Sequence, residues 1–313
     1  MDKPFKSIEE QVELLESRGV ITDDETAAIL RREGYYSIVN GYKAPFIDED
    51  RTALEGDDRF TAGTKFSDIH GLFIFDRNLR ELTFHYLIRV EALVKTACAY
   101  CFSEKHGAHD DYLQLSSYAT EAEYTSFGLN DYGKNLVRLI STLEYQSKNS
   151  RSEFILHYQE KYGVVPLWVL VNDLSFGNIQ HFYNLMKPDE QIAVCRHIAQ
   201  ATGRSGSRKL GYFDPSEAKT SIDYLVKIRN TCAHDDRLYC VRVGTHRECG
   251  YAMMLTRIER FLPEPEYQEL LNGVIQLLNA SAATSPIMRH LIGNMGFEMH
   301  KEVGKTVVRL PNA

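Results

Sequence analysis

Hydrophobic positions recur at helical spacing along most of the chain, and most clearly between Ser67 and about His106. This segment contains no proline, and its apolar residues repeat at intervals of three or four, as they do on one face of a helix. The repeating positions are Leu72, Phe75, Leu79, Leu82, Tyr86 and Val90. The pattern therefore predicts one long helix with Ser67 as its N-cap.

Two short helices are predicted before this segment. In "SIEEQVELLESRG", Ser7 stands three residues before Glu10, which is the spacing of a capping box, and Gly19 is suited to end the helix. "DDETAAILRREG" is predicted as a second helix that ends at Gly34. The aromatic-rich "YYSIVNGYKAPF" follows, and the polar residues 47–66 are predicted as a loop.

The second half of the chain continues the helical pattern. After a loop-like stretch at 107–130, a charged amphipathic segment extends to about Tyr162. The strongly apolar "PLWVLVNDLSFGNIQHFYNLM" then begins at Pro166, a residue favoured in the first turn of a helix. Asp214 and Pro215 begin the next helix, and two or three shorter helices are expected after it.

These elements predict an all-α fold. We expect an N-terminal helical appendage at 1–66, a helical core at 67–240 and a C-terminal helical extension, packed on the core, at 241–313.

Composition narrows the functional classes. The chain has 313 residues and 43% hydrophobic content, enough for a substantial core, and its net charge is −7. Proteins that bind nucleic acid regardless of sequence are usually basic, so this average argues against that class, although it is compatible with a local basic groove. The first residues lack the apolar core of a signal peptide, and the apolar run "VVPLWVLV" is too short to span a bilayer. We therefore expect a soluble, cytoplasmic protein without a membrane partner.

The six cysteines do not predict a metal centre. Cys98 and Cys101 form a CxxC within a predicted helix, but no second CxxC completes a zinc site, and packing of the two thiols is the better interpretation. Two other groups have a spacing that only weakly resembles metal ligands. The first is Cys240, His246 and Cys249, and the second is His106 with His109. We expect no metal and no cofactor.

The stretch "IRNTCAHDDRLY" has the residue types that metal-independent RNA cleavage needs. Histidine titrates near neutral pH and can move the proton of a 2′-hydroxyl, and the arginine fork matches phosphate oxygens. Arg229 and His234 supply this pair, and Asn230 shares a helical face with His234. On an ideal helix, residues five apart lie about 140° around the axis, so the pair could flank a groove more easily if the helix ended near His234.

This spacing alone is common in the chain. Arg80 with His85 and Arg151 with His157 have a similar spacing. Other roles for the pair are an ion pair of the arginine with a nearby aspartate and stabilisation of a histidine at a helix C-terminus by the helix dipole. The nearby aspartates are Asp223, Asp235 and Asp236.

A basic stretch precedes the motif. From Gln191 to Phe213 there is no acidic residue. The basic residues there are Arg196, His197, Arg204, Arg208 and Lys209. They indicate either a loop that contacts RNA phosphates or a solvated loop. Aromatic residues that could stack on bases, or pack in the core, are Trp168, Tyr35, Tyr36 and Tyr42.

Five segments in order resemble the bacterial abortive-infection Abi proteins of the AbiD/AbiF type. They are "EEQVELLESRG", "YYSIVNGYKAPF", "FDRNLRELTFHYLIRVEALVKTACAY", "PLWVLVNDLSFGNIQHFYNLM" and "IRNTCAHDDRLY". That family is similar to the HEPN superfamily, whose R-x(4–6)-H motif cleaves RNA. The resemblance implies a HEPN-like helical bundle, catalytic Arg229 and His234, and a homodimer in which two motifs face one another. Asn230 is the polar residue that commonly follows the arginine in that motif, and from its spacing we expect it to orient the imidazole or a phosphate.

The sequence departs from the family pattern after the histidine. Asp235 and Asp236 stand where a neutral or basic residue is common, and they could tune the imidazole or repel RNA. In addition, Asn172 follows "WVLV" where relatives often have Glu, and the neighbouring Asp173 could substitute for that carboxylate.

The leading hypothesis is a metal-independent endoribonuclease in phage defence that leaves a 2′,3′-cyclic phosphate. Arg237 would be a secondary phosphate contact, and an antitoxin, a small noncoding RNA or an inactive assembly would restrain the enzyme. The alternative is a non-catalytic sensor or scaffold that binds a structured small RNA. A third hypothesis is an interaction protein whose "RNTCAH" segment closes a dimer interface.

Overall fold

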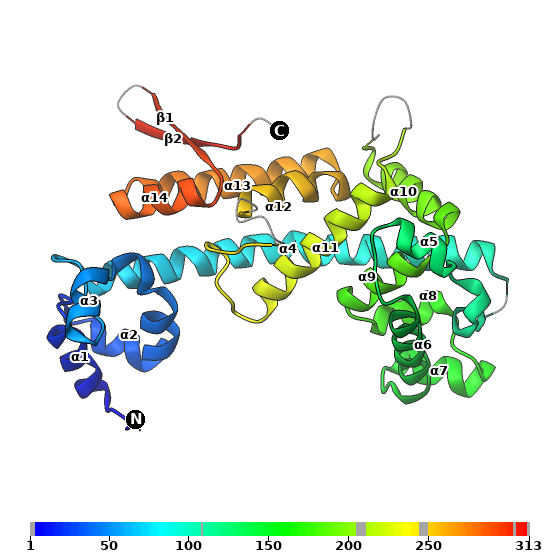
Figure 1. Ribbon diagram of the computed structural model, residues 1–313, viewed down its shortest axis with the longest axis horizontal. Helices are drawn as coiled ribbons and strands as arrows, with labels where there is room; N and C mark the ends of the chain where they lie inside the picture. Colours follow the sequence, from blue (N-terminus) through cyan, green and yellow to red (C-terminus); the bar gives the residue numbers. More distant parts are fainter. Residues whose placement is uncertain (1–3, 108, 205–210, 244–249, 303–304, 312–313) are drawn as a thin grey trace. The chain divides into compact units, whose positions relative to one another are not determined.

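The computed structural model describes residues 4–107, 109–204, 211–243, 250–302 and 305–311. These residues are mainly helical (Figure 1), so the prediction of an all-α fold is confirmed. The described strands form one antiparallel hairpin near the C-terminus, in which Met299 pairs with Val308. Its strands are β1 (Glu298–Glu302) and β2 (Lys305–Arg309). This hairpin was not predicted, because only helices were expected after residue 240.

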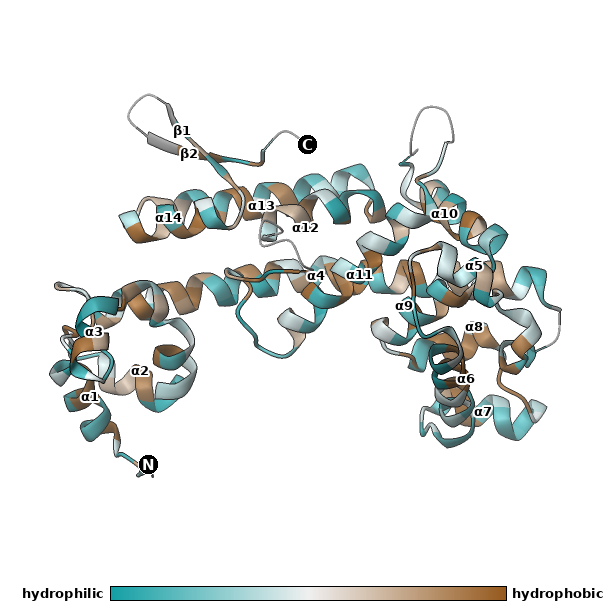
Figure 2. Ribbon diagram, in the orientation of Figure 1, coloured by the Kyte–Doolittle hydropathy of each residue, from teal (hydrophilic) through white to brown (hydrophobic). Residues whose placement is uncertain are grey.

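The longest element is α4 (Phe66–Lys105), and it confirms the predicted long helix. It begins one residue before Ser67, and the carboxylate of Asp68 accepts a hydrogen bond from the backbone N–H of Lys65 at 3.0 Å. Figure 2 shows hydrophobic and polar residues alternating along α4. Contacts within the chain define two compact units, and α4 contributes to both, with the division after Glu81.

The first unit comprises Met1–Glu81, Asp235–Val241 and Val274–Pro311. Its helical elements are α1 (Ile8–Ser17), α2 (Thr26–Glu33), the π-helix η1 (Tyr36–Asn40), the 3₁₀ turn η2 (Ala44–Phe46), α3 (Glu49–Glu55), the first part of α4, the last part of α13 (Glu264–Ala282) and α14 (Pro286–Asn294). Figure 1 shows α1, α2 and α3 grouped near the start of α4. The predicted capping box of Ser7 and Glu10 is present. Residues in this core are fully buried, among them Leu15, Leu30, Ile38, Phe66 and Leu72.

The second unit comprises Leu82–His234, Arg242–Gly273 and the chain end. Its helices after α4 are α5 (Glu121–Ser126), α6 (Tyr132–Asn149), α7 (Glu153–Tyr162), α8 (Leu167–Leu170), α9 (Phe176–Leu185), α10 (Pro188–Thr202), α11 (Pro215–Ala233), α12 (Tyr251–Ile258) and the first part of α13. Short 3₁₀ turns are η3 (Asp111–Leu113), η4 (Leu115–Ser117), η5 (Val171–Asp173) and η6 (Glu259–Phe261). Helix α11 packs against α9, α10 and α12, which places the motif helix inside a helical core.

Two predicted boundaries differ from the structure. The apolar segment that begins at Pro166 is broken into α8 and α9, because Leu174 is extended and Ser175 begins a new capping box with Asn178. The two segments predicted as loops, 47–66 and 107–130, also contain the short helices α3 and α5. Within the part of the chain that the structure describes, no helix is both long and apolar enough to cross a membrane.

Candidate functional site

The motif lies at the C-terminal end of α11, which begins as predicted. The carboxylate of Asp214 accepts a hydrogen bond from the backbone N–H of Ser216 at 2.8 Å, and Pro215 occupies the first turn. The helix ends at Ala233, and His234 is its C-cap, with its backbone N–H donating to the carbonyl of Asn230 at 3.0 Å. His234 thus makes the last hydrogen bond of the helical pattern, and the chain leaves the helix after it.

The imidazole of His234 is available to a ligand. His234 is exposed, and among the described residues no hydrogen-bond or ion-pair partner is found for its ring. An exposed histidine without an internal partner can take or give a proton at a bound substrate.

Arg229 is held by an acid that the sequence analysis did not identify. Its Nε donates to Oε2 of Glu91 at 2.9 Å, and its Nη2 donates to Oε1 of the same carboxylate at 3.4 Å. Its Nη1 donates to Oδ1 of Asn230 at 3.1 Å. Glu91 lies on α4, is 7% exposed and also pairs with Lys95 at 2.9 Å. The ion pair considered for Arg229 therefore forms, but with Glu91 rather than with a nearby aspartate.

This arrangement orients the guanidinium without using all of its donors. A guanidinium has an N–H on Nε and two on each Nη. Glu91 and Asn230 take the Nε donor and one donor of each Nη, so one N–H on each Nη remains for a ligand. N–H donors on an oriented guanidinium suit the oxygens of a phosphate.

The residues after His234 are anchored within the first unit. The carboxylate of Asp76, fully buried on α4, accepts hydrogen bonds from the backbone N–H groups of Leu238 (3.1 Å) and Tyr239 (2.6 Å), from the hydroxyl of Tyr42 (2.8 Å) and from Arg80 (2.7 Å). Burial raises the pKa of Asp76, and the hydrogen bonds from Tyr42 and the charge of Arg80 oppose this. The end of the motif is thus fixed by a satisfied polar network.

Asp235 and Asp236 have different surroundings. Asp235 has a φ of 56°, in the left-handed region that often follows a helix end, and its carboxylate forms an ion pair with Arg80. Asp236 is exposed, and its backbone carbonyl accepts a hydrogen bond from Arg80 at 3.3 Å. Among the described residues, no partner is found for the Asp236 carboxylate. The charge of Asp235 is therefore compensated, and that of Asp236 is not.

The other Arg–His spacings have separate explanations. Arg80 is buried in the Asp76 network, whereas His85 is exposed and contacts Arg89 at 2.9 Å. Arg151 is exposed on the segment before α7. Asp173, considered as a substitute carboxylate, accepts a hydrogen bond from the hydroxyl of Ser152 at 2.6 Å.

The predicted RNA-binding residues are placed unevenly. Arg237 is exposed, and one of its Nη groups donates to the carbonyl of Gly41 at 3.2 Å. Arg196 is exposed, with its guanidinium 5.0 Å from the ring centroid of Tyr212. Arg204 is paired with two carboxylates, those of Glu259 and Glu264, each at 2.8 Å. Arg208 and Lys209 lie outside the described residues.

The candidate metal ligands have other contacts. Cys98 and Cys101 are buried, and burial raises the pKa of the Cys101 thiol to about 11. His106 contacts Glu190 at 2.7 Å, and the ring of His109 lies 5.5 Å from that of Trp168. Within the described ranges no group of three or more potential ligands could hold a metal ion. His246 and Cys249 lie outside these ranges.

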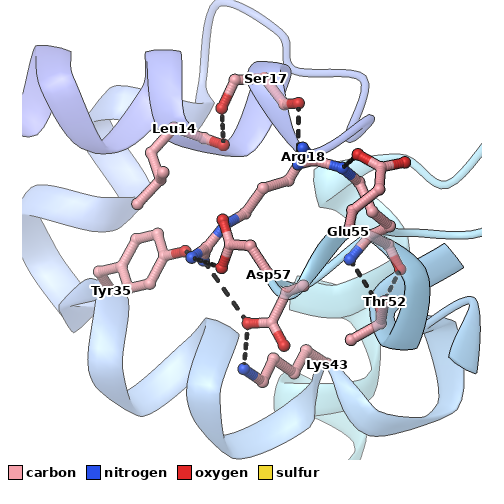
Figure 3. Close-up of polar contacts among 10 residues, drawn as sticks. Leu14, Ser17, Arg18, Tyr35, Lys43, Thr52, Glu55 and Asp57 are labelled. Carbon is pink, nitrogen blue, oxygen red and sulfur yellow. Dashed lines mark hydrogen bonds and ion pairs between the residues drawn. The ribbon is translucent and has the colours of Figure 1, made fainter.

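The first unit contains a large cavity, of about 1020 Å³, lined by α1, η1 and α3. Most of its charged side chains pair with one another, as Figure 3 shows for Arg18, which donates to the hydroxyl of Tyr35 at 3.2 Å and to both carboxylate oxygens of Asp57. Lys43 and Asp58 form a second ion pair there. These mutual pairings leave few polar groups to recognise a charged ligand.

A family model described as "Abi-like protein" matches residues 28–240. This span contains the Asp76 network, Glu91 and the whole Arg229–His234 motif, and it covers more than half of the chain. No curated protein and no solved structure matches the chain.

Proposed function

We propose that this chain, which belongs to the Abi-like protein family, is a metal-independent endoribonuclease with Arg229 and His234 as its catalytic residues. Membership in the family supports a role in abortive infection, a form of phage defence. The observation that carries the catalytic proposal is the combination of an oriented guanidinium and, five residues later, an exposed imidazole, for both of which the described residues leave donor or acceptor positions unused.

In the proposed reaction, the imidazole of His234 takes the proton of an RNA 2′-hydroxyl, and the resulting 2′-oxygen attacks the adjacent phosphorus. The bond from phosphorus to the 5′-oxygen breaks, and this oxygen leaves with a proton from a second acid. The products are a 2′,3′-cyclic phosphate and a 5′-hydroxyl. The free N–H groups of Arg229 stabilise the charge that develops on the phosphate oxygens.

A homodimer would supply the second acid. Two copies of the motif facing one cleft would place one imidazole as base and the other as acid. Glu91 and Asn230 are positioning residues in this scheme, because they contact Arg229 and not the RNA. We also propose a restraint on the activity, either an antitoxin or a small noncoding RNA, since unregulated RNA cleavage would harm the host cell.

The direct test compares the wild-type protein with His234→Ala, Arg229→Ala and the control variant His85→Ala, which removes another exposed histidine. RNA cleavage and its end groups are measured in vitro, with and without EDTA, and RNA integrity is followed in infected cells. We expect His234→Ala to lose about 10²- to 10⁴-fold in cleavage rate, and EDTA and His85→Ala to have no effect.

The alternatives give different outcomes. Equal cleavage by the wild-type protein and His234→Ala would refute this site. Binding of RNA without cleavage, abolished by charge reversal at Arg196 but not by His234→Ala, would favour the RNA-binding scaffold. A homodimeric site further predicts that a mixture of Arg229→Ala and His234→Ala subunits recovers part of the activity that each variant lacks.

A further inference from the structure

A second, smaller cavity lies in the first unit beside the residues that follow His234. Its volume is about 310 Å³, and one wall is the π-helix η1 with Gly41, while another is the segment 235–237. Tyr42 and Phe73 form its apolar part. We propose that this cavity binds one nucleobase of the RNA, preferentially guanine, and thereby sets the sequence preference of cleavage. This inference rests on the proposed function, because the base belongs to an RNA substrate.

The wall formed by η1 presents unused recognition groups. Tyr36, on η1, is 80% exposed, which is unusual for a large aromatic residue on a folded helix. Ser37 and Asn40 on the same element are also exposed. Within the described parts of the chain, no hydrogen bond is found for the side chains of these three residues. π-Helical turns are rare and are frequently found at functional sites. An exposed tyrosine ring is a platform on which a base can stack.

The opposite wall supplies the acceptor that selects the base. Asp235 forms an ion pair with Arg80, whereas no partner is found among the described residues for the Asp236 carboxylate, so both of its oxygens can accept hydrogen bonds from a ligand. Its backbone is held by the bond from Arg80 to its carbonyl, which reduces the freedom of the residue. A carboxylate accepts two parallel hydrogen bonds from adjacent N–H donors. Among the four RNA bases, guanine presents two such donors, N1–H and N2–H, on its Watson–Crick edge.

Arg237 completes the chemistry of a nucleotide site. It lines the same cavity, and its bond to the carbonyl of Gly41 leaves other guanidinium donors free for a phosphate oxygen. Its positive charge also offsets the repulsion between RNA phosphates and the Asp236 carboxylate. Because residues 235–237 follow His234 directly in the chain, a base bound here would belong to a nucleotide near the cleaved phosphate. The two aspartates that depart from the family pattern thus have separate roles, one structural and one in base recognition.

The experiment measures binding of GMP, AMP, CMP and UMP to the full-length His234→Ala protein by calorimetry or NMR titration. This background removes turnover and leaves the cavity intact. We expect GMP to bind about 5- to 100-fold more tightly than the other three nucleotides, which is the discrimination typical of one bidentate contact. Asp236→Asn should remove this preference, because an amide replaces one acceptor by a donor. Asp24→Asn, at an exposed acid of the same unit, should leave it unchanged.

A second pair of variants tests the stacking surface. Tyr36→Ala should lower the binding affinity for all four nucleotides by about tenfold. Tyr36→Phe keeps the ring and should bind them with the affinity of the parent protein. Absence of GMP binding, equal binding of the four nucleotides, or a GMP preference that persists in Asp236→Asn would each overturn the proposal. The binding measurement is independent of cleavage, so loss of the base site leaves the ribonuclease proposal standing if His234→Ala abolishes cleavage. A preserved GMP preference in a protein that does not cleave RNA would refute the ribonuclease proposal and leave the base-binding site standing.

Discussion

Replacement of Asp76 by alanine should destabilise the protein by about 3–5 kcal/mol, which is the usual cost of removing one partner of a buried ion pair. Asp76 is fully buried and accepts four hydrogen bonds, two from backbone N–H groups of Leu238 and Tyr239 and two from the side chains of Tyr42 and Arg80. The substitution would remove this acceptor from the two backbone N–H groups and the hydroxyl of Tyr42, and Arg80 would keep only Asp235 as a carboxylate partner. This loss is a large part of the roughly 5–15 kcal/mol that typically stabilises a domain.

Asp235, the second carboxylate that pairs with Arg80, provides an internal comparison. The side chain of Asp235 is 70% exposed, so solvent screens its ion pair with Arg80. Asp235→Asn, which keeps a residue tolerant of the left-handed conformation, should therefore lose less than about 1 kcal/mol. Both variants lose one carboxylate from the same arginine, but Asp76 is buried and also accepts hydrogen bonds from Leu238, Tyr239 and Tyr42, so its loss should cost more.

The assay is urea denaturation followed by circular dichroism, with the midpoint and the slope determined for each variant. Asp24→Ala, at an exposed acid without a described partner, should change stability by no more than about 0.5 kcal/mol. The double variant Asp76→Ala/Arg80→Met should be less destabilised than the sum of the single variants by about 1–3 kcal/mol, since it no longer strands the buried charge. A loss below about 1 kcal/mol for Asp76→Ala, or strict additivity of the pair, would contradict this explanation.

Three further outcomes follow from the same structure. In urea denaturation, the free energy of unfolding of Asp235→Gly should stay within about 1 kcal/mol of the wild type, whereas that of Asp235→Val should fall by about 2 kcal/mol, because a β-branched residue is strained at a φ of 56°. Equal stability of the two variants would contradict the strain argument. Glu91→Gln should lower the cleavage rate about 10- to 100-fold, because it loosens the guanidinium that binds phosphate, whereas the exposed Glu81→Gln on the same helix should cleave normally; equal rates would remove the positioning role of Glu91. Cys101 should resist iodoacetamide at pH 8 while the exposed Cys240 reacts, because burial raises the Cys101 pKa to about 11 and leaves only about one thiol in a thousand ionised. If mass spectrometry finds Cys101 modified first, its thiol is not protected by burial.

Local interactions explain what could be predicted from the sequence. The all-α class, the long helix α4, the capping box of Ser7 and Glu10, and the start of α11 at Asp214 depend on residues within one or two helical turns of each other. Side-chain caps and apolar periodicity are read from neighbouring positions, so a single sequence contains the information. The candidate pair Arg229 and His234 was also found from spacing and family resemblance. The break between α8 and α9 was missed because apolar periodicity continues across it.

The tertiary structure decided which distant groups meet the motif. Glu91 is 138 residues from Arg229, and Asp76 is 162 residues from Leu238, so no local pattern connects them. One signal for Asp76 was present, since this acid lies four residues after Leu72 on the apolar face of a predicted helix, where a charge requires partners. Whether Asp235 and Asp236 are compensated could not be read from the sequence. That depends on Arg80, which only the fold brings to Asp235, because a charge is neutralised by the groups near it in space and not by those near it in the chain.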